Sequence, residues 1–509
     1  MKTQYDELPD DCYLASNVRE FDRVMIQENA VPGIVLMERA GQAVFDLIKT
    51  GWPDIKVLMI VCGIGNNAGD GFIIARLALQ AGLKVVIIQC GDPSKIKDDA
   101  LLAKNGFLYS GGKIECFSGV LPVGLYLLVD ALFGTGLERE ITGDWALVIN
   151  QINQSACDVV SVDIPSGLNS DNGAVMGVAV QATATVSFIG LKQGMFTAEG
   201  KQCCGQINFD DLGVPQSVYQ NTKEDARLIK YAHFKKYLIP RRQSVHKGQN
   251  GHVLLIGGNY GYAGAIRMAA EACLRVGAGL VSVVTRPGNA VIINSHTPEI
   301  MCHEMDELTE LKELINQSSV IVIGPGLTMK QWGRLFFSEI LKSNKPLVLD
   351  ADALNLLVEL KIDFGKNNWV LTPHPGEAAR LLDCTVKNIQ HDRFKVIAEL
   401  QKKYSGFIVL KGSGSLVMSP DKSMSICTDG NPGMATGGMG DILTGVIAGL
   451  IAQQFEMNVA IPLAVCIHSK AADMAVTTGE RGLLATDLLP HLRKLMNPLM
   501  LKKTSEEVL

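Results

Sequence analysis

The amino-acid sequence predicts an α/β protein of two domains, each built on a parallel sheet with helices on both faces. The chain has 509 residues, enough for two large domains at roughly 100–200 residues each. Short apolar runs alternate with helix-like segments in both halves, as expected for buried parallel strands joined by crossover helices. A polar stretch near residue 225 separates the two series, so we expect domains at residues 1–224 and 225–509.

The strands expected in the first half are apolar runs at residues 56–62, 84–90, 125–132 and 158–164. A helical pattern over residues 72–81 is closed by Gly82, a common helix stop. Two amphipathic helices are expected ahead of the first strand, at residues 18–28 and 34–49.

The same alternation restarts after the polar stretch. A strand at residues 252–258 is followed by a helix over residues 263–276. Further strands are expected at residues 280–285, 320–324, 346–350, 369–372 and 407–411.

Composition excludes several classes of protein. Hydrophobic residues make up 47% and charged residues 19%, an ordinary globular balance that rules out a disordered or fibrous chain. The net charge is −5 without a basic stripe, which argues against a dedicated nucleic-acid binder. The 12 cysteines form no CxxC pair, which favours free thiols in a reducing compartment and disfavours a zinc site. We see neither a signal core nor an apolar run of about 18–20 residues, so we expect a cytoplasmic protein.

Three loops in the first half follow directly on expected strands and combine glycine with polar side chains. They cover residues 63–71, 130–137 and 163–169. Ligands bind outside the carboxyl ends of parallel strands, so the loops point to one shared site. The first loop leads into a helix whose N–H groups could receive a phosphate, but it lacks the dinucleotide fingerprint and the P-loop lysine. Taken singly, each loop could be a tight turn only.

Oxygen-bearing side chains at this edge also suggest a cation site. Asn67, Asp130 and Ser166 carry little charge together, which suits a monovalent ion better than Ca²⁺. Asp163 or Asp70 is the natural candidate for proton transfer.

In their order, these loops resemble the epimerase domain of NAD(P)H-hydrate repair proteins. Residues 37–41 (MERAG) and 190–192 (GLK) match as well, and the likeness covers about residues 15–215. It implies a Rossmann-like three-layer α/β/α domain, with K⁺ held by Asn67, Asp130 and Ser166 and with Asp163 catalytic. The residues implied in binding the hydrated dinucleotide are Asn66, Asn67, Ala68, Gly69, Asp70, Gly134, Thr135, Gly136, Leu137, Glu138, Arg139, Glu140 and Asp163. Ala68 stands where the family usually has glycine, and a positive φ there would strain it.

The strongest signal in the chain is the segment at residues 431–441, NPGMATGGMGD, ahead of an apolar helix expected over residues 442–452. Glycines at a helix start expose backbone N–H groups, and the helix dipole there favours developing negative charge. Asp441 could accept the proton of an attacking hydroxyl group. Phosphoryl transfer needs these two parts, although a glycine-rich cap or hinge is the alternative interpretation.

Other polar segments lie at neighbouring strand ends. Residues 411–415 (KGSGS) could wrap a nucleotide phosphate or ribose. The carboxylates of residues 350–355 (DADALN) suit water- or Mg²⁺-mediated phosphate contact. His374, in the segment TPHPGE, is either a structural hydrogen-bonder or a substrate contact, and its company favours the second; His468 fits better as a core residue of a helix.

These segments resemble the ribokinase-like fold and, within it, the ADP/ATP-dependent NAD(P)H-hydrate dehydratases. Residues 246–248 (HKG), 255–258 (LIGG), 277–281 (GAGLV) and 324–327 (GPGL) extend the likeness over about residues 240–495. It implies an α/β/α domain with substrate contacts from Ala265, Gly326, His374 and Asp441, the last of them catalytic. It implies nucleotide contacts from Lys411, Gly412, Ser413, Gly414, Ser415 and Gly440. Thr328 departs from the glycine that usually follows Gly-Pro-Gly-Leu.

Both resemblances belong to one repair pathway, so we expect a bifunctional enzyme. The first domain would interconvert the R and S epimers of NADH or NADPH hydrated across the C5–C6 bond. The second would dehydrate the S form at the expense of ADP, giving AMP and phosphate. K⁺ is expected in the epimerase domain, and Mg²⁺ with the co-substrate ADP in the dehydratase domain.

Two alternatives stay open. One is a ribokinase-like kinase for a vitamin-precursor alcohol, fused to a nucleotide-binding N-terminal domain. The other is an N-terminal scaffold module that has lost catalysis, against which the polar residues at the predicted site argue. In either case we expect small-molecule partners, neither nucleic acid nor membrane, and assembly into a homo-oligomer.

Overall fold

The computed structural model describes residues 4–220, 222–362 and 364–498. The chain divides into two compact units. Unit 1 comprises Met1–Leu228 and Gln390–Asp392, and unit 2 comprises Ile229–Ile389 and Arg393–Leu509. The main division after Leu228 lies close to the boundary that the polar stretch suggests.

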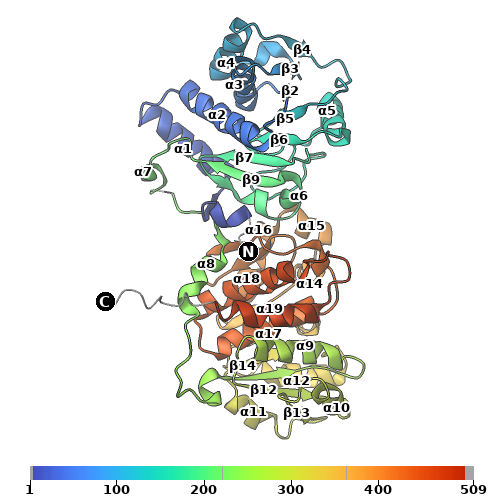
Figure 1. Ribbon diagram of the computed structural model, residues 1–509. Coiled ribbons are helices and arrows are strands. Elements are labelled where there is room, and N and C mark those ends of the chain that lie inside the picture. The colour runs from blue at the N-terminus through green and yellow to red at the C-terminus, as the bar shows by residue number, and fades with distance from the viewer. Residues whose placement is uncertain (1–3, 221, 363, 499–509) are drawn as a thin grey trace, which may run out of the picture. The chain divides into compact units, whose positions relative to one another are not determined.

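Unit 1 contains a parallel sheet (Figure 1), with strands in the order β4-β3-β2-β5-β6-β7-β9. Every neighbouring pair runs parallel, as the continuous apolar runs predict. The order reverses between β2 and β5, which makes the ends of these strands the switch point where α/β sheets bind ligands. The strands are β2 (Val57–Cys62), β3 (Lys84–Gln89), β4 (Ile114–Cys116), β5 (Leu127–Ala131), β6 (Val159–Val162), β7 (Ala184–Phe188) and β9 (Gln206–Asp210).

Helices cover both faces of this sheet, as predicted. Leu58, Ile60 and Cys62 of β2 pack in one core cluster with side chains of α1 to α4, whereas Met59 and Val61 pack with α5 on the other face. The helices are α1 (Ala15–Gln27), α2 (Gly33–Gly51), α3 (Asn66–Gln80), α4 (Asp98–Tyr109), α5 (Gly143–Gln154), α6 (Gly200–Cys204) and α7 (Gln216–Tyr219).

A small ribbon accompanies the main sheet of unit 1. Strand β1 (Asp11–Tyr13) pairs in parallel with β8 (Leu191–Lys192) and antiparallel with β10 (Ala226–Ile229). The register sets Tyr13 opposite Lys192, so the chain enters α1 beside the end of β8.

In unit 2 the strands follow the order β13-β12-β11-β14-β15-β16-β17-β18-β19. Pairs from β13 to β17 are parallel, and β18 and β19 are added antiparallel, which the sequence analysis did not foresee. The strands are β11 (His252–Ile256), β12 (Leu280–Thr285), β13 (Met301–Glu304), β14 (Val320–Ile323), β15 (Leu347–Leu349), β16 (Trp369–Leu371), β17 (Phe407–Leu410), β18 (Ser415–Met418) and β19 (Met424–Cys427).

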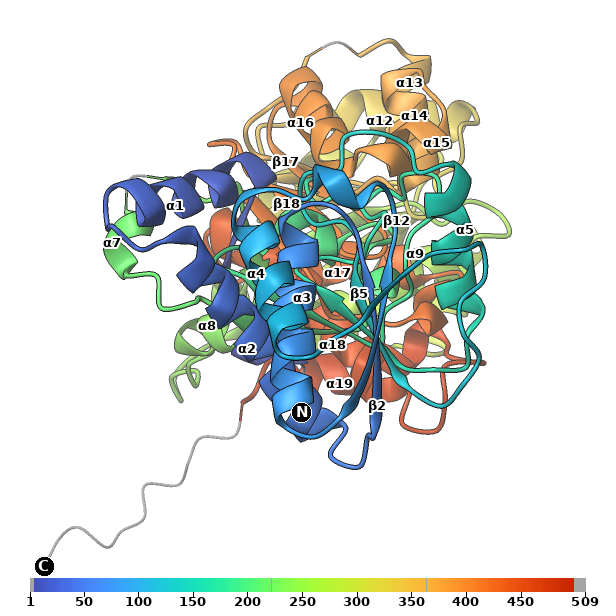
Figure 2. The same ribbon diagram turned by 90° about the horizontal axis from the view of Figure 1, so that it is seen from above.

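The helices of unit 2 also form two layers. Figure 2 shows α12, α13, α14 and α16 gathered on one side, and α17, α18 and α19 on the other. The second group packs with α9 against Val253 and Leu255 of β11 in one buried cluster. The helices are α8 (Tyr231–Phe234), α9 (Ala263–Arg275), α10 (Asn289–Asn294), α11 (Leu311–Gln317), α12 (Gln331–Ile340), α13 (Asp352–Glu359), α14 (Pro375–Leu382), α15 (Val386–His391), α16 (Arg393–Tyr404), α17 (Met439–Ala452), α18 (Met457–Ala475) and α19 (Leu488–Leu495).

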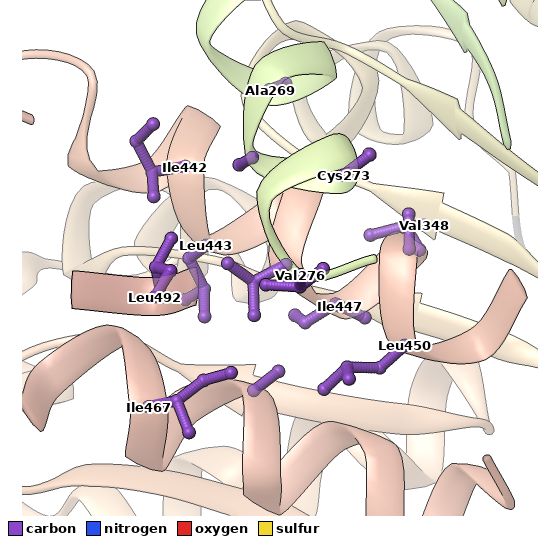
Figure 3. Close-up of a cluster of buried hydrophobic side chains, with 14 of the residues drawn as sticks. Ala269, Cys273, Val276, Val348, Ile442, Leu443, Ile447, Leu450, Ile467 and Leu492 are labelled. Atoms are coloured by element: carbon purple, nitrogen blue, oxygen red, sulfur yellow. The ribbon is translucent and has the colours of Figure 1, made fainter. Parts of the chain in front are cut away.

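Helix α17 is buried in the core and lies unusually close to α9 (Figure 3). A methyl group on Gly445 would lie 2.1 Å from the carbonyl oxygen of Ala269, and one on Gly449 would lie 3.0 Å from that of Cys273. These two glycines therefore let the backbones of the helices touch. This contact prevents α17 from sliding along its own axis, and so it also fixes the position of the residues at the start of the helix.

Two chain-wide findings agree with the composition. Each of the 12 cysteines is a free thiol. Within the described ranges, no helix combines the length and apolarity that crossing a bilayer requires.

Candidate functional sites

Asp130, at the end of β5, ties together the loops that follow β5 and β6. Its fully buried carboxylate accepts hydrogen bonds from Ser161 Oγ at 2.9 Å, Ser166 N at 2.8 Å and Ser166 Oγ at 2.6 Å. Phe133 N donates in turn to Ser166 Oγ at 2.9 Å. Burial raises the pKa of Asp130, although these hydrogen bonds oppose the shift. Asp130 and Ser166, predicted from separate loops, thus lie together at the sheet edge.

Asn67 and Asp163 meet beside Gly134. A methyl group on Gly134 would lie 3.4 Å from Asn67 Oδ1 and 3.4 Å from Asp163 Oδ2. Asn67 is buried, and within the described residues its Nδ2 has no hydrogen-bond partner. A buried amide without a partner costs free energy, so this group is suited to receive a ligand. Gly134 opens the predicted binding loop at residues 134–140, which belongs to no helix or strand.

Asp163 follows β6 with a φ of +67°, which is uncommon outside glycine and is typical of functional positions. Its Oδ1 pairs with the ammonium group of Lys192. Lys192 is fully buried and also donates to Ser187 Oγ at 3.1 Å and to Phe188 O at 3.0 Å. The second oxygen of Asp163 is left facing Gly134. Sequence reasoning found Lys192 only as part of a motif, because sequence does not show its burial against Asp163.

Two further carboxylates surround the Asp163–Lys192 pair. Burial raises the pKa of Asp70, on α3, well above its usual value, and Asp163 and Asp22 add to the shift. Burial also raises the pKa of Asp22, on α1, to about 6, with Lys192 opposing and Asp163 adding. Asp70 lies in the first predicted loop, at residues 63–71, whereas Asp22 lies far along the chain from the glycine-rich loops and has no signal in the sequence.

The predicted binding segment at residues 66–70 is helical, not a loop. Helix α3 begins at Asn66, well before the expected start at residue 72. Ala68 is therefore in the first helical turn and not at a positive φ, so the expectation of strain at this position is wrong. Gly69 is needed here for close packing and not for a turn, because a methyl group on it would lie 2.4 Å from Met37 Sδ.

In unit 2, α17 begins within the glycine-rich segment. Gly438 precedes the helix at a φ of +92° and accepts a bond from Ile442 N at 3.0 Å. The first N–H groups of an α-helix have no partner inside the helix, so residues 439–441 offer donors to an anion. Asp441 lies in this first turn. Burial raises its pKa to about 7, and the charge of Asp350 adds to the shift.

An ion pair between a partly exposed lysine and a buried aspartate lies beside this helix start. Lys411 Nζ is 2.8 Å from Asp350 Oδ1, and a methyl group on Gly440 would lie 3.1 Å from the same ammonium. Thr372 and Thr444 donate to Asp350 at 2.8 and 2.9 Å. Burial opposes ionisation, but Lys411 holds the pKa of Asp350 below its usual value. Asp350 therefore anchors Lys411.

Glu377 and His374 share the next strand end. His374 N donates to Glu377 Oε2 at 2.8 Å, and Gly376 N donates to His374 Nδ1 at 2.9 Å. Nδ1 is thus an acceptor, and His374 Nε2 lies 3.4 Å from Glu377 Oε1. Burial raises the pKa of Glu377 to about 7, with Lys411, 3.9 Å away, opposing. The half-exposed imidazole is held in one orientation and faces Glu377.

The predicted nucleotide segment at residues 411–415 covers the turn between β17 and β18 and the first residue of β18. Ser415 Oγ donates to Gly412 O at 3.1 Å, and Gly412 has a φ of +143°. Arg393, buried on α16, donates to Leu410 O at 3.1 Å and to Lys411 O at 3.3 Å. Burial lowers the pKa of Arg393 to about 10. Sequence reasoning missed this arginine, because nothing in the pattern of α16 distinguishes it from a surface residue.

The segment Gly-Pro-Gly-Leu crosses the start of α9, which carries Ala265. Gly326 has a φ of +61°, and a methyl group there would lie 2.8 Å from the carbonyl oxygen of Tyr262. Thr328 also has a positive φ, +61°, which explains why glycine is usual there. Asn259 Nδ2 donates to Thr328 Oγ1 at 2.7 Å, a bond that offsets part of the strain.

His468 is buried on α18, as predicted, and burial lowers its pKa to about 4. A hollow of about 1430 Å³ lies elsewhere in unit 2, lined among others by Arg241, Arg275 and Arg493. None of the predicted site residues lines it, so it is not the place where the chemistry described above is gathered.

Comparison with known proteins identifies the family. Residues 33–194 match the family "YjeF-related protein N-terminus", and residues 253–494 match the family "NAD(P)H-hydrate dehydratase". A protein of Coxiella burnetii named "Bifunctional NAD(P)H-hydrate repair enzyme Nnr" is 45% identical over 96% of this chain and 99% of its own length. The chain belongs to the bifunctional NAD(P)H-hydrate repair enzyme family. The protein of the same name from Escherichia coli K12 is 39% identical over 100% of this chain and 98% of its own length.

Two solved structures resemble about half of this chain. A ribokinase-like superfamily protein of Enterococcus faecalis covers 54% of this chain and 98% of its own, with 31% identity and a TM-score of 0.51. An ADP/ATP-dependent NAD(P)H-hydrate dehydratase of Bacillus subtilis, co-crystallised with ATP/Mg²⁺, covers 53% and 96% with 26% identity and a TM-score of 0.47.

The predicted fold class and the predicted epimerase and dehydratase activities of the repair enzyme family are confirmed. The relatives support the repair reaction and not the vitamin-precursor kinase that stayed open from the sequence.

Proposed function

We propose that unit 2 restores NAD(P)H by phosphorylating the C6 hydroxyl of the hydrated nicotinamide ring. Asp441 takes the hydroxyl proton as the oxygen attacks the β-phosphorus of ADP, and AMP leaves. Phosphate then leaves C6 while C5 loses a proton, which restores the C5–C6 double bond. Phosphate leaves far more easily than hydroxide does. The observation that carries this proposal is Asp441 in the first turn of α17, beside the ion pair of Lys411 with the buried Asp350.

The nucleotide would lie between α17 and the turn after β17. We assign its contacts to residues 411–415 and Gly440, and the substrate contacts to Ala265, Gly326, His374 and Asp441. Lys411 neutralises phosphate charge, while Arg393 holds the turn from beneath.

Mg²⁺ is proposed as the companion of the nucleotide. Within the described residues, no group of three or more histidine, cysteine, aspartate or glutamate side chains could hold a metal. Asp350 accepts hydrogen bonds from Lys411, Thr372 and Thr444. Mg²⁺ commonly keeps several waters and binds through substrate phosphates, which fits this site.

Unit 1 would interconvert the two epimers of the hydrated dinucleotide. The proposed contacts are residues 66–70 and 134–140, with Asp163 as the catalytic carboxylate. Asp163 Oδ2 faces the predicted binding loop, while Oδ1 is neutralised by Lys192. This leaves one carboxylate oxygen free to receive a proton from water or substrate.

We assign K⁺ to Asn67, Asp130 and Ser166. The buried charge of Asp130, the Ser166 hydroxyl 2.6 Å from it and the Oδ1 atom of Asn67 beside Gly134 supply the oxygens of a weakly charged site. Once bound, K⁺ would offset the negative charge of Asp130 and of the dinucleotide phosphates.

The cation assignment is tested by epimer exchange in K⁺ buffer against tetramethylammonium buffer. Asp130→Ala should slow exchange and leave the ADP-dependent rate on the S epimer unchanged. Equal exchange in both buffers, with Asp130→Ala like the parent, rejects the K⁺ site.

The dehydratase assignment is tested by incubating the chain with hydrated NADH and ADP. The expected result is recovery of NADH absorbance with AMP as the nucleotide product. Recovery without loss of ADP would overturn the phosphorylation route.

Location and assembly stay predictions. Free thiols at all 12 cysteines fit a reducing cytoplasm, where we place the protein as a homo-oligomer acting on hydrated NADH, hydrated NADPH and ADP. Size-exclusion chromatography with light scattering tests the assembly.

A further inference from the structure

Arg286, at the end of β12, is held in one orientation but keeps unused hydrogen-bond donors. Its guanidinium carbon lies 4.7 Å from the ring centroid of Tyr260 and 5.9 Å from that of Trp332. Its Nη1 lies 2.5 Å from Asp306 Oδ1. Within the described ranges, Nη1 is the one nitrogen of this guanidinium that has a partner, and Nε is buried without one. Because 21% of the side chain is exposed, a ligand can reach the remaining donors.

A series of contacts connects Arg286 with the proposed substrate site. A methyl group on Gly326 would lie 2.7 Å from Tyr262 Cβ, so the loop after β11 touches the glycine that we assign to the substrate. Asn259 N donates to Gly326 O at 2.7 Å and fixes the same loop. Tyr260 lies in this loop, is 56% exposed and turns its ring towards the Arg286 guanidinium. The loop thus leads from Gly326 to Arg286 along the carboxyl edge of the sheet.

The end of β12 is tied to that loop by buried hydrogen bonds. Thr285 Oγ1 and Asn289 Nδ2 both donate to Gly258 O, at 2.7 and 2.6 Å. On the other side of Arg286, Trp332 Nε1 donates to Met305 O at 2.8 Å, which fixes the indole ring. The surroundings of the guanidinium are therefore set before any ligand binds.

The dinucleotide substrate must extend towards β12. The start of α17, where the reacting ring belongs, lies beside Asp350 at the end of β15. ADP is assigned to residues 411–415, after β17, on one side of this point; Gly326 follows β14 and Ala265 follows β11 on the other side. Strand β12 is three strand spacings from β15, roughly 14 Å at about 4.8 Å each. Two nucleotides joined through a diphosphate span this distance, so the adenosine end of the substrate comes to the end of β12.

NADH and NADPH differ only at the adenosine ribose, where NADPH carries a 2′-phosphate in place of a hydroxyl group. An arginine guanidinium donates two parallel hydrogen bonds to a phosphate, whereas a carboxylate accepts from ribose hydroxyl groups. Arg286 and Asp306 place one group of each kind side by side, and 54% of the Asp306 side chain is exposed. The neighbouring carboxylate of Glu304 already accepts from the N–H groups of Gly288 and Ala290.

We propose that Arg286 binds the 2′-phosphate of hydrated NADPH and that Asp306 accepts a hydrogen bond from the ribose 2′-hydroxyl of hydrated NADH. The inference rests on the dehydratase site proposed for unit 2, and it adds the residues that discriminate between the two substrates. Arg286 attracts the 2′-phosphate, and Asp306 repels it. The pair thereby lets one site accept both hydrates.

The test compares the S epimers of hydrated NADPH and hydrated NADH, each with saturating ADP and the full chain. Arg286→Met removes the charge but keeps a side chain that packs between Tyr260 and Trp332. We expect kcat/KM for hydrated NADPH to fall about 10–100-fold, mainly through KM, and that for hydrated NADH to fall by less than about threefold. Arg286→Lys keeps the charge without the planar fork, so its loss on hydrated NADPH should be smaller.

Asp306→Asn tests the other half of the pair. It removes a negative charge beside the 2′-phosphate, so the ratio of kcat/KM for hydrated NADPH to that for hydrated NADH should rise about 3–10-fold. The control is Arg275→Met, which removes an equal charge in the last turn of α9, away from the start of that helix. Arg275 pairs at 3.0 Å with Glu271, and its loss should leave the ratio unchanged.

Equal losses on the two hydrates in Arg286→Met overturn the inference, because the arginine would then serve the diphosphate that both share, or the fold. An Asp306→Asn variant with the parent's ratio overturns it as well, whether or not Arg286→Met folds. An unchanged rate on hydrated NADH shows that a variant is folded. If the parent restores neither hydrate with ADP, the function proposed for unit 2 fails first.

Discussion

Replacing Lys411 with methionine should destabilise unit 2 strongly. The change keeps the length of the side chain but leaves the buried carboxylate of Asp350 without its cation. Thr372 and Thr444 would still donate to Asp350, but they bring no charge. Removing one partner of a buried ion pair costs about 3–5 kcal/mol. At about 2–4 °C per kcal/mol for a unit of this size, Tm should fall by roughly 6–20 °C.

The loss of stability caused by Lys411→Met should increase as pH rises. In the parent, Lys411 keeps the pKa of Asp350 low against the effect of burial, so the pair contributes stability that is lost as pH falls. In the variant only burial acts strongly on Asp350, and it raises the pKa. The folded variant then takes up a proton and loses stability as pH rises. The difference in Tm between parent and variant should therefore widen from about pH 5 to about pH 8.

The assay is differential scanning calorimetry of the parent, Lys411→Met, Asp350→Asn and the double variant. The two single changes should couple by more than about 2 kcal/mol, because the double variant removes both charges. Lys387→Met, at an exposed position on α15, serves as the control and should leave Tm unchanged. Additive effects of the two single changes, or a pH-independent loss, would refute the reasoning.

Three further predictions concern unit 2. Asp441→Asn should slow dehydration about 10²–10⁴-fold, while ADP should still raise the Tm of the variant. The rate of the parent should rise through about pH 7 as Asp441 ionises, and near-normal turnover of the variant would reject the role of Asp441 as base. Gly445→Ala should lower the free energy of unfolding by about 1–3 kcal/mol, because its methyl group would meet the backbone of Ala269. An unchanged unfolding midpoint in urea would contradict this close contact. Thr328→Gly should relieve a positive φ but lose the bond from Asn259, so the free energy of unfolding should change by less than about 1 kcal/mol, and a larger change in urea melts would show that one effect dominates.

The sequence predicts the parallel cores of both units well, because buried strands have a strong signature. The runs that became β2, β3, β11 and β12 are largely apolar and are followed by glycine-bearing turns. Strand β4 is short and largely exposed, and β19 lies in an antiparallel pair, so neither carries that signature. The local sequence pattern identifies strands that are buried on both faces, but it gives only a weak signal for strands at the edge of a sheet.

The candidate sites were predicted where a residue type and a loop coincide, and missed where burial creates the function. Asp163 and Asp441 stand beside glycines at strand or helix ends and were singled out. Arg393 carries no local mark and Lys192 is marked only by the GLK motif, because their roles depend on partners distant in sequence. The glycine at position 69 suggested a loop at residues 66–70, but this segment is helical. Its small residues let a neighbouring helix pack closely.

The backbone contact between α9 and α17 has an electrostatic consequence. Gly445 opposes Ala269 and Gly449 opposes Cys273, so the two helices run in the same direction and begin at the same end of unit 2. Parallel dipoles placed side by side repel each other, and their two positive ends are concentrated where Asp441 lies. Core packing holds this arrangement without relieving it. An anion that binds between the two helix starts relieves this repulsion. The fold therefore favours anion binding there through a repulsion that exists before the anion arrives.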